Sequence, residues 1–224
     1  MGQKAASKKT AETQAPTPFE HDRTGIARVA VIDLQSVAAY SPSRQIEEEE
    51  LPPGERKQNG ESHLAFDMRT WRKKAHYQAD GLVVIPGIAF QRALVAAAQL
   101  RGEKVKGRGS MIFKQHFMSA VFPNGSAVLT PHLRAQDLAH ERVMCDPSGK
   151  KGTAGGARVP RYFPLIPQWS ARLEFFVTHP AITREIFQAH LVDAGLYIGV
   201  GRWRPQNGGL HGRFAITSLT LSDR

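Results

Sequence analysis

The sequence predicts an α+β fold, and three observations indicate it. β-branched and apolar runs such as residues 28–40 are typical of buried strands. Residues 171–177 alternate between apolar and polar side chains, which is the period of a half-buried strand. Residues 88–100 and 181–194 carry apolar side chains at helical spacing. Strands and helices interleave along the chain, as they do in an α+β domain.

The best-defined unit spans residues 81–102. A short apolar run leads into a Pro86-Gly87 turn, and helix-forming residues follow to about Leu100. Gly102 lies just past the expected end of this helix, where glycine commonly stops a helix. We therefore expect a strand, a tight turn and a helix in direct succession.

The middle of the chain predicts more strand. Residues 110–122 are expected to form one strand, and residues 123–126, Pro-Asn-Gly-Ser, a hairpin turn into a second strand at 127–133.

The C-terminal part predicts a helix, a loop and a strand. Thr178 or Thr183 can cap the helix at 181–194, and Gly195 is expected to end it. A glycine-rich loop follows, and the final strand begins at about Arg213.

Two long segments interrupt these elements. Residues 41–80 contain four consecutive glutamates and several turn-forming residues, which indicate a long solvated loop or hairpin. Residues 134–168 offer no evident core and indicate a mobile insertion. Residues 1–24 are small, polar and proline-containing, so we expect a disordered tail before a single domain at 25–224.

With the insertions removed, the element order is close to βαββαβ. This is the order of a modified ferredoxin-like, RRM-like core. The sequence therefore predicts such a core, with long thumb-like insertions at about 41–80 and 134–168.

The 224 residues carry a formal net charge of +10, from 30 Lys and Arg against 20 Asp and Glu. This excess favours a polyanionic partner, while an acidic membrane face or an acidic protein stays open. No apolar run approaches the roughly 18 residues that span a bilayer, and no secretory signal opens the chain. Cys145 is the single cysteine, which excludes an internal disulfide and favours a reducing cytoplasm.

The strongest functional signal is the glycine- and arginine-rich stretch 199–214. Glycine allows positive φ and close backbone approach, while arginine offers a permanently charged fork for phosphate. Exposed backbone N–H groups in such a loop can also hold an anion. The combination favours a surface that grips a phosphodiester chain without reading its bases. The structural alternative is a folded loop in which Trp203 fills the core and the arginines face water.

A second candidate site is the turn at Pro86-Gly87. A helix N-terminus directs free N–H groups and a positive dipole end toward one point, and Gln91 and Arg92 lie in the first turns. A phosphate could be held there. The alternative is an ordinary turn between a strand and a helix.

Basic clusters at residues 69–74 and 101–114 form a third signal. Trp71 and Tyr77 lie beside the first cluster and could stack on bases. The alternative is a solvated face, in which the first cluster pairs with the nearby glutamates.

Sequence signatures of catalysis are thin. The chain has no P-loop, no HExxH and no CxxC. His132, His140 and Cys145 form only a loose trio, and Cys145 has no adjacent base, so we expect no metal and no cofactor. We therefore expect a binding protein rather than an enzyme. The candidate acids, none of which has a motif around it, are Asp33, Asp67, Asp80 and Asp146.

The early turn and helix, combined with the late glycine loop and terminal strand, resemble the RAMP superfamily of CRISPR proteins. The closer similarity is to the Cas-seven-type backbone subunits, which polymerise along guide RNA. Pro86-Gly87 matches the start of the family's Pro-Gly-Ser-Ser-Leu-Lys-Gly type stretch, while residues 88–91 depart from it. The residues that match the family's late loop are Gly199, Gly201, Arg202, Gly208, Gly209, Gly212 and Arg213.

The resemblance implies a guide-RNA-binding backbone subunit that oligomerises head-to-tail along crRNA in a cytoplasmic CRISPR-Cas effector complex of antiviral defence. The implied partners are guide RNA with its complementary target, adjacent copies of the chain and other effector subunits, with no membrane. The residues expected to contact RNA are Arg72, Lys73, Lys74, Gln91, Arg92, Lys104, Lys106, Arg108, Gly199, Gly201, Arg202, Arg204 and Arg213.

Two alternatives stay open. RNA-cleaving members of the family use an aspartate in an early loop, so Asp67 or Asp80 would make the chain a RAMP-type endoribonuclease. The other alternative is a phage single-stranded nucleic-acid-binding protein, or a compact phage- or plasmid-encoded homologue that subverts a host CRISPR complex.

Overall fold

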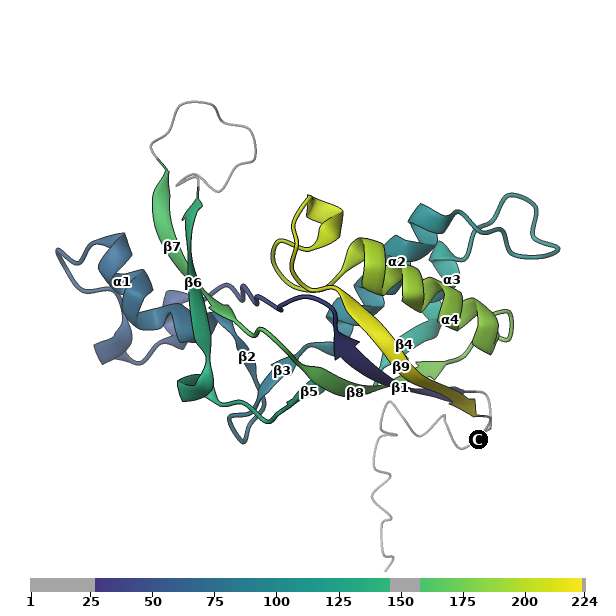
Figure 1. The fold of residues 1–224 in the computed structure, drawn as a ribbon, viewed down its shortest axis with the longest axis horizontal. Coiled ribbons are helices and arrows are strands. Elements are labelled where there is room, and N and C mark those ends of the chain that lie inside the picture. Colours follow the sequence, from purple (N-terminus) through teal and green to yellow (C-terminus); the bar gives the residue numbers. More distant parts are fainter. Residues whose placement is uncertain (1–26, 146–157, 223–224) are drawn as a thin grey trace, which may run out of the picture.

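The computed structural model describes residues 27–145 and 158–222. These residues form an α+β fold with an antiparallel sheet, as the sequence predicts. Figure 1 shows an elongated molecule in which a sheet covered by helices continues, at one end, into a second group of elements. The predicted tail at 1–24 lies outside the described residues.

Seven strands of the described chain form one antiparallel sheet. Its centre is the pair β1 (Arg28–Ser36) and β8 (Ser170–Val177), and β9 (Phe214–Ser222) flanks β1. The predicted strands at 28–40 and 171–177 and the final strand are thus confirmed. The remaining strands lie beyond β8 and are β4 (Val121–Pro123), β5 (Ala127–Thr130), β3 (Val83–Ile85) and β2 (His76–Tyr77).

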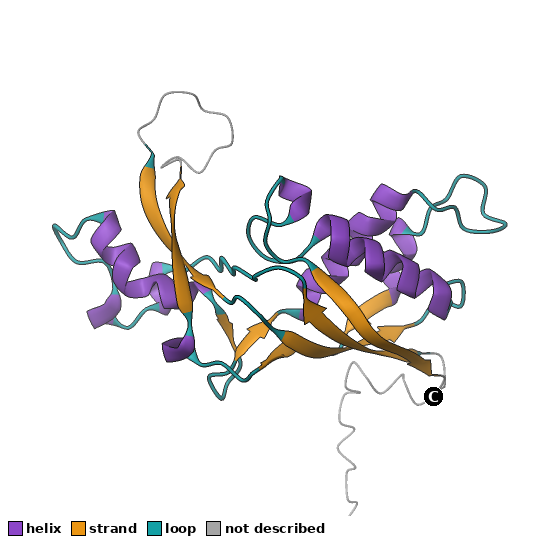
Figure 2. Ribbon diagram, viewed as in Figure 1, coloured by secondary structure: helices purple, strands orange, loops and turns teal. Residues whose placement is uncertain are grey.

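Three helices lie on the same face of this sheet: α2 (Gly87–Arg101), α3 (Lys114–Ala120) and α4 (Arg184–Asp193), as Figures 1 and 2 show. Buried phenylalanines fill the space between the layers. The rings of Phe90 and Phe214 lie 5.4 Å apart, centroid to centroid, and those of Phe175 and Phe187 lie 5.9 Å apart. Removing this apolar surface from water holds the helices on the sheet.

Helix α2 confirms the predicted helix at 88–100. Phe90, Leu94 and Ala97 lie on its buried face, as their spacing predicts. Gly102 follows the helix with φ of +63°, the left-handed conformation that glycine adopts at little cost.

The strand predicted at 110–122 is wrong, because most of this stretch forms helix α3. Phe113, Phe117 and Ala120 are buried at spacings of four and three residues, which is the period of a helix and not of a strand. Only the last residues of the stretch extend, as β4. The apolar content of the segment was compatible with either structure, and contact with α2 and α4 selects the helix.

The hairpin predicted at 123–133 is also wrong. β4 and β5 pair with β8 and not with each other, so residues 121–130 run along β8 as one interrupted strand. Asn124 continues this pairing, since its N–H donates to the Glu174 carbonyl at 2.8 Å. The Asn-Gly turn therefore makes a bulge, because β8 offers hydrogen-bond partners on both sides of it.

Helix α4 begins where the sequence predicts. The Thr183 hydroxyl accepts a hydrogen bond from the Ile186 N–H at 3.3 Å, so Thr183 is the cap. Gly195, however, does not end the helical run, which continues through a π-helical turn, η6 (Ala194–Ile198), to Gly199. Gly195 packs against the Phe214 carbonyl, where a Cβ atom would overlap the oxygen.

The insertion at 41–80 contains ordered helix in place of the predicted loop or hairpin. Its first part holds two single 3₁₀ turns, η2 (Glu48–Glu50) and η3 (Pro53–Glu55), and is largely exposed. The second part holds α1 (His63–Thr70) and a further 3₁₀ turn, η4 (Trp71–Lys74). The Ser62 hydroxyl caps α1 by accepting from the Ala65 N–H.

The insertion predicted to be mobile and coreless at 134–168 contains an antiparallel β-hairpin. Its strands are β6 (Ala139–Cys145) and β7 (Val159–Leu165), preceded by the 3₁₀ turn η5 (Ala135–Asp137). Leu138, Val143 and Ile166 are buried. This prediction was wrong for the described part, since the insertion finds its apolar partners in other segments; residues 146–157 lie outside the described residues.

The two insertions pack against each other at one end of the molecule (Figure 1). The Asp67 carboxylate of α1 accepts hydrogen bonds from the Tyr162 N–H of β7 at 2.6 Å and from the Lys74 ammonium. The Trp71 ring lies 4.8 Å from the His140 ring of β6. We call the elements η2, η3, α1, η4, η5, β6 and β7 together the insertion lobe. In the part of the chain that the structure describes, no helix is long and apolar enough to cross a membrane.

Candidate nucleic-acid interface

The glycine-rich loop, residues 199–213, is closely folded on itself. The Val200 N–H donates to the Gly212 carbonyl at 3.0 Å. Gly212 has φ of +73°, and a Cβ atom there would overlap the Val200 carbonyl. Gly201 has φ of +80°, and a Cβ there would lie 2.6 Å from the Tyr40 ring. These glycines therefore serve close backbone packing, as in the structural alternative of the sequence analysis.

Arg202 points from this loop into the insertion lobe. Its guanidinium donates to the Glu141 carboxylate of β6 and lies 3.8 Å from the centroid of the Phe163 ring of β7. The same carboxylate oxygen accepts from the Ser41 hydroxyl, and His211 also contacts Glu141 at 3.2 Å. Burial lowers the pKa of Arg202, while Glu141 acts against that shift. Arg202 thus joins the loop to the lobe, and it does not face water.

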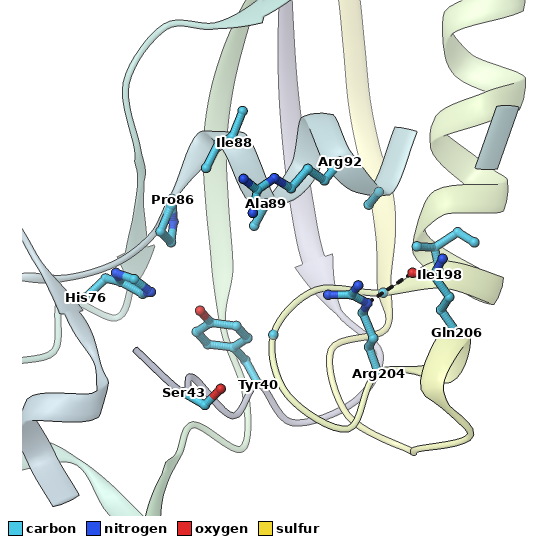
Figure 3. A pocket seen from close by; sticks show the side chains of 13 residues that line it. Tyr40, Ser43, His76, Pro86, Ile88, Ala89, Arg92, Ile198, Arg204 and Gln206 are labelled. Atoms are coloured by element: carbon cyan, nitrogen blue, oxygen red, sulfur yellow. Dashed lines mark hydrogen bonds between the residues drawn. The ribbon is translucent and has the colours of Figure 1, made fainter. Parts of the chain in front are cut away.

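Arg204, two residues further along the loop, faces an open cavity of about 300 Å³. Figure 3 shows the cavity between the glycine-rich loop, the N-terminus of α2 and residues from the segment after β1. Arg92 of α2 lies on the same cavity, and the Arg204 guanidinium is held by the Gln206 side-chain oxygen at 3.2 Å. None of the described residues that line the cavity is acidic. Its other polar residues are Tyr40, Ser43, His76 and Gln206.

The N-terminus of α2 contributes backbone donors to this cavity. Pro86 precedes the helix and no side chain caps it. The Ala89 N–H donates to the Pro86 carbonyl at 2.9 Å, so the Gly87 and Ile88 N–H groups are the ones left for solvent or a ligand. Gly87 is required there, because a Cβ atom would overlap the Gly125 carbonyl. Two arginines and a positive helix end therefore surround one opening, an arrangement that attracts an anion such as phosphate.

His76 is the third basic group at this cavity. Burial lowers its pKa, and the positive charge of Arg44 lowers it further. His76 is therefore biased toward the neutral form, in which it offers one donor and one acceptor. Sequence reasoning missed Tyr40, Ser43 and His76, since nothing in their local sequence marks them and only the fold brings them beside Arg92.

Gln91 does not reach the cavity. Its side chain is buried, and its Nε2 donates to the Val121 carbonyl at 2.6 Å. This bond ties α2 to β4. Arg213 is half-buried and donates to the carbonyls of Leu196 and Leu210. These bonds stabilise the glycine-rich loop.

The second basic cluster, at residues 101–114, lies at the C-terminal end of α2, and we call it the basic connector. Lys104, Lys106 and Arg108 are exposed in the loop that follows this helix. The helix has 15 residues, which at 1.5 Å per residue separates the connector from the cavity by about 22 Å. The connector and the cavity therefore form two basic regions and not one short groove.

The basic cluster on η4 is engaged within the insertion lobe. Lys73 pairs with Glu55, and Lys74 donates to Asp67 and to the Tyr162 carbonyl. Arg72 lies over the Trp71 ring at 4.3 Å and donates to the Ala135 carbonyl. Arg72 and Lys73 keep exposed surface, whereas Lys74 is largely covered.

Asp67 and Asp80, the aspartates of the endoribonuclease alternative, differ in burial and in their hydrogen-bond partners. Asp67 is buried and its carboxylate is taken up by Lys74 and the Tyr162 N–H. Asp80 is exposed, and its carboxylate accepts from the Leu82 N–H at 3.0 Å in a turn. Among the described residues, no three His, Cys, Asp or Glu side chains are grouped closely enough to hold a metal ion.

The solved structures that are similar to this chain include the following two. A cryo-EM structure of the type III-B Cmr-beta bound to cognate target RNA is 12% identical, with a TM-score of 0.49, over 92% of this chain and 65% of that chain. A crystal structure of Cmr6 from Pyrococcus furiosus is 12% identical, with a TM-score of 0.41, over 86% of this chain and 99% of that chain. This chain thus spans about 65% of the length of the matched Cmr-beta chain.

No protein-family model and no curated protein matches the sequence. The function proposed below rests on the residues of this chain.

Proposed function

We propose that this protein is an RNA-binding backbone subunit of a CRISPR-type effector complex, and that it holds the RNA by its phosphates. The observation that carries the proposal is the cavity at the α2 N-terminus, where Arg92 and Arg204 lie beside a helix start that no side chain caps. Among the described residues, no carboxylate lines this cavity. The net charge of +10 supports a polyanionic partner. The motif resemblance to RAMP proteins supports RNA over DNA.

The proposed fold is a modified ferredoxin-like core. The elements β1, α2, β4 with β5, β8, α4 and β9 follow the order βαββαβ. The first and third of the four strand positions, β1 and β8, lie at the centre of the sheet, and the second and fourth lie outside them. This strand order supports the assignment, with the insertion lobe added at one end.

The groups at the cavity are of the kinds that bind the phosphate backbone of a nucleic acid. Arginine guanidinium and helix N–H groups bind phosphate oxygens irrespective of the base attached. Such contacts position a strand but carry no sequence information. In the proposed role, sequence recognition belongs to pairing between the bound RNA and its complement.

Head-to-tail assembly is part of the proposal. Glu47 and Glu49 are exposed in the insertion at 41–80, and Lys104, Lys106 and Arg108 are exposed in the loop after α2. Figure 1 places the insertion lobe and this loop at opposite ends of the molecule. Unlike charges at opposite ends support contact between successive copies.

The test is binding of single-stranded RNA by the full chain. We expect affinity to rise with RNA length, to fall steeply with salt and to vary little with base sequence. Mass photometry at increasing RNA length should show successive copies on one strand. Absence of salt-dependent binding to single strands would refute the proposal. Equal binding of DNA and RNA of one sequence would favour the general single-strand binder.

A further inference from the structure

Trp203 has an unusual backbone conformation. Its φ is +52°, and among the described residues it is the one non-glycine residue with positive φ. A bulky side chain in this region costs conformational free energy, because Cβ crowds the backbone. Glycine is frequent in this loop, yet a tryptophan occupies this position. Such a cost is commonly tolerated where a side chain is held for binding.

The surroundings of Trp203 maintain this conformation. The His211 N–H donates to the Trp203 carbonyl at 3.0 Å. Gly209 crosses directly over the same carbonyl, where a Cβ atom would overlap it. The loop therefore closes behind the Trp203 backbone, and its side chain is left facing outward.

The indole is exposed, unlike the other tryptophans of the chain. Trp203 is 46% exposed, whereas Trp71 is 4% and Trp169 is 2% exposed. The structural alternative in the sequence analysis, with Trp203 filling the core, is therefore wrong. Trp71 and Trp169 fill the core instead, and Trp203 lies outside the core with nearly half of its surface exposed.

A fixed cation lies behind the indole. The Arg202 guanidinium is 4.6 Å from the Trp203 ring and 3.8 Å from the Phe163 ring. The Lys74 ammonium lies 4.3 Å from the Phe163 ring in turn. Because Glu141 binds Arg202, the guanidinium is already in place before any ligand arrives. Lys74, Phe163, Arg202 and Trp203 thus form one stack that runs from the insertion lobe to the surface.

We propose that Trp203 is a stacking platform for an unpaired nucleobase. The inference rests on the proposed function and adds a base contact to its phosphate contacts. A base is flat and apolar on its faces, and stacking on an aromatic ring strengthens binding whichever base is present. Arg204, the next residue, lies on the cavity that is proposed to hold phosphate. Because the two residues are consecutive, a strand whose phosphate lies at Arg204 has a neighbouring base within reach of Trp203.

The neighbouring basic cavity favours a base over an apolar protein partner, because Arg204, the residue after Trp203, lies on it together with Arg92. Arg202 stiffens the indole from below, so little side-chain freedom is lost on binding. Unpaired bases expose their flat, apolar faces, whereas the paired bases of a duplex are already stacked on one another. The platform therefore selects single strands over duplex, and recognition does not depend on which base is present.

The experiment measures binding of fluorescein-labelled oligouridylate and of a matched oligomer with abasic positions, which has the same charge. Trp203→Asn removes the ring and keeps a residue that tolerates positive φ, so the loop can fold. Trp203→Phe keeps a smaller ring. Leu210→Ala is the matched control, because Leu210 is 74% exposed in the same loop and has no ring.

We expect Trp203→Asn to weaken oligouridylate binding roughly 5- to 150-fold, with Trp203→Phe in between and Leu210→Ala close to the parent. Binding of the abasic oligomer should be equal for the parent and Trp203→Asn. Iodide should quench chiefly Trp203 in the free protein, and bound oligouridylate should protect it. Equal oligouridylate affinity for the parent and Trp203→Asn would overturn the inference and leave the phosphate contacts standing. If the parent binds neither oligomer, the proposed function fails as well.

Discussion

The Glu141 carboxylate accepts a hydrogen bond from Arg202 across 61 residues of sequence. Glu141 belongs to the β6–β7 hairpin and Arg202 to the glycine-rich loop. Phe163, the cross-strand partner of Glu141, lies under the same guanidinium. One ion pair therefore couples the insertion lobe to the loop that bears both Arg204 and Trp203.

Glu141→Gln should lower the free energy of unfolding by about 2 kcal/mol, because a largely buried guanidinium loses its counter-charge. Urea denaturation measures this loss. Arg142→Gln, at the exposed neighbouring position, is the control and should change stability little. Equal stability of the two variants would show that the ion pair does not hold the lobe to the loop.

Arg92→Gln and Arg204→Gln should each weaken single-stranded RNA binding about 5- to 10-fold near 0.1 M salt, since each removes one phosphate contact. The slope of log affinity against log salt should fall by about 0.7 for each. Fluorescence anisotropy across a salt series measures both quantities.

Arg172→Gln is the matched control for these two variants. It removes the same unit of charge from the sheet face that the helices leave uncovered, where Arg172 pairs with Asp33. If it weakens binding as much as Arg92→Gln, the effect is one of net charge and the cavity is not the site.

Gly212→Ala and Gly208→Ala separate backbone strain from steric overlap. Both glycines have φ near +75°, but a Cβ at Gly212 would overlap the Val200 carbonyl, while a Cβ at Gly208 has open space. We expect a loss of roughly 1 kcal/mol for Gly208→Ala and roughly 3–5 kcal/mol for Gly212→Ala in thermal or urea unfolding. Similar losses at the two positions would mean that the loop opens easily at Val200.

Stability should rise with pH between about 5 and 7, because burial lowers the pKa of both His116 and His190 below 6.5. His190 Nδ1 donates to the Ile186 carbonyl, and its Nε2 is buried with no hydrogen-bond partner among the residues that the structure describes. His116 faces His179 and Arg108, whose charges act in the same direction as burial. Protonation of either ring is therefore disfavoured in the folded protein.

The unfolded chain takes up protons near pH 6.5, whereas the folded chain does so only at lower pH. Stability is therefore full above about pH 6.5 and is lost as pH falls, by up to about 1.4 kcal/mol per pH unit for each histidine. Urea denaturation from pH 5 to 7 measures the slope, and His190→Gln should reduce it. Exposed His132 provides the control substitution. An unchanged slope in His190→Gln would mean that the ring titrates normally.

Asp67→Asn should destabilise the protein by about 2 kcal/mol, because the buried Lys74 ammonium and the Tyr162 N–H lose a charged acceptor. Asp80→Asn, at an exposed turn, should change stability little. With Mg²⁺ or Mn²⁺ we expect no cleavage of labelled RNA by the parent or by either variant. Cleavage by the parent that Asp80→Asn abolishes would establish the endoribonuclease alternative.

Local sequence predicted the elements whose signal lies within one segment. Helix α2 was predicted from its apolar spacing and Gly102, and the start of α4 from Thr183. Helix α3 was not, because Phe113 and Phe117 fit a strand as well as a helix until α2 and α4 pack on them. The Asn-Gly turn at residues 124–125 failed as a hairpin signal because β8 competes for the hydrogen bonds of both flanking strands.

Local sequence also predicted only some of the residues of the candidate site correctly. Arg92 and Arg204 could be chosen from charge beside a helix start and a glycine loop, and both lie on the cavity. Gln91 and Arg202 have the same local signals but turn inward, to the Val121 carbonyl and to Glu141. Composition cannot distinguish an arginine that faces water from one whose partner lies 61 residues away.

By itself, the sequence determined the α+β class, the positive charge and the glycines that the loop requires, since these depend on composition, spacing and local backbone conformation. The tertiary structure decided that the described part of the insertion at 134–168 forms a pair of antiparallel strands, that Arg202 packs against Phe163 and Glu141, and that Trp203 is left exposed. The physical reason is that burial and ion pairing depend on which distant segments meet, and no local pattern encodes that meeting.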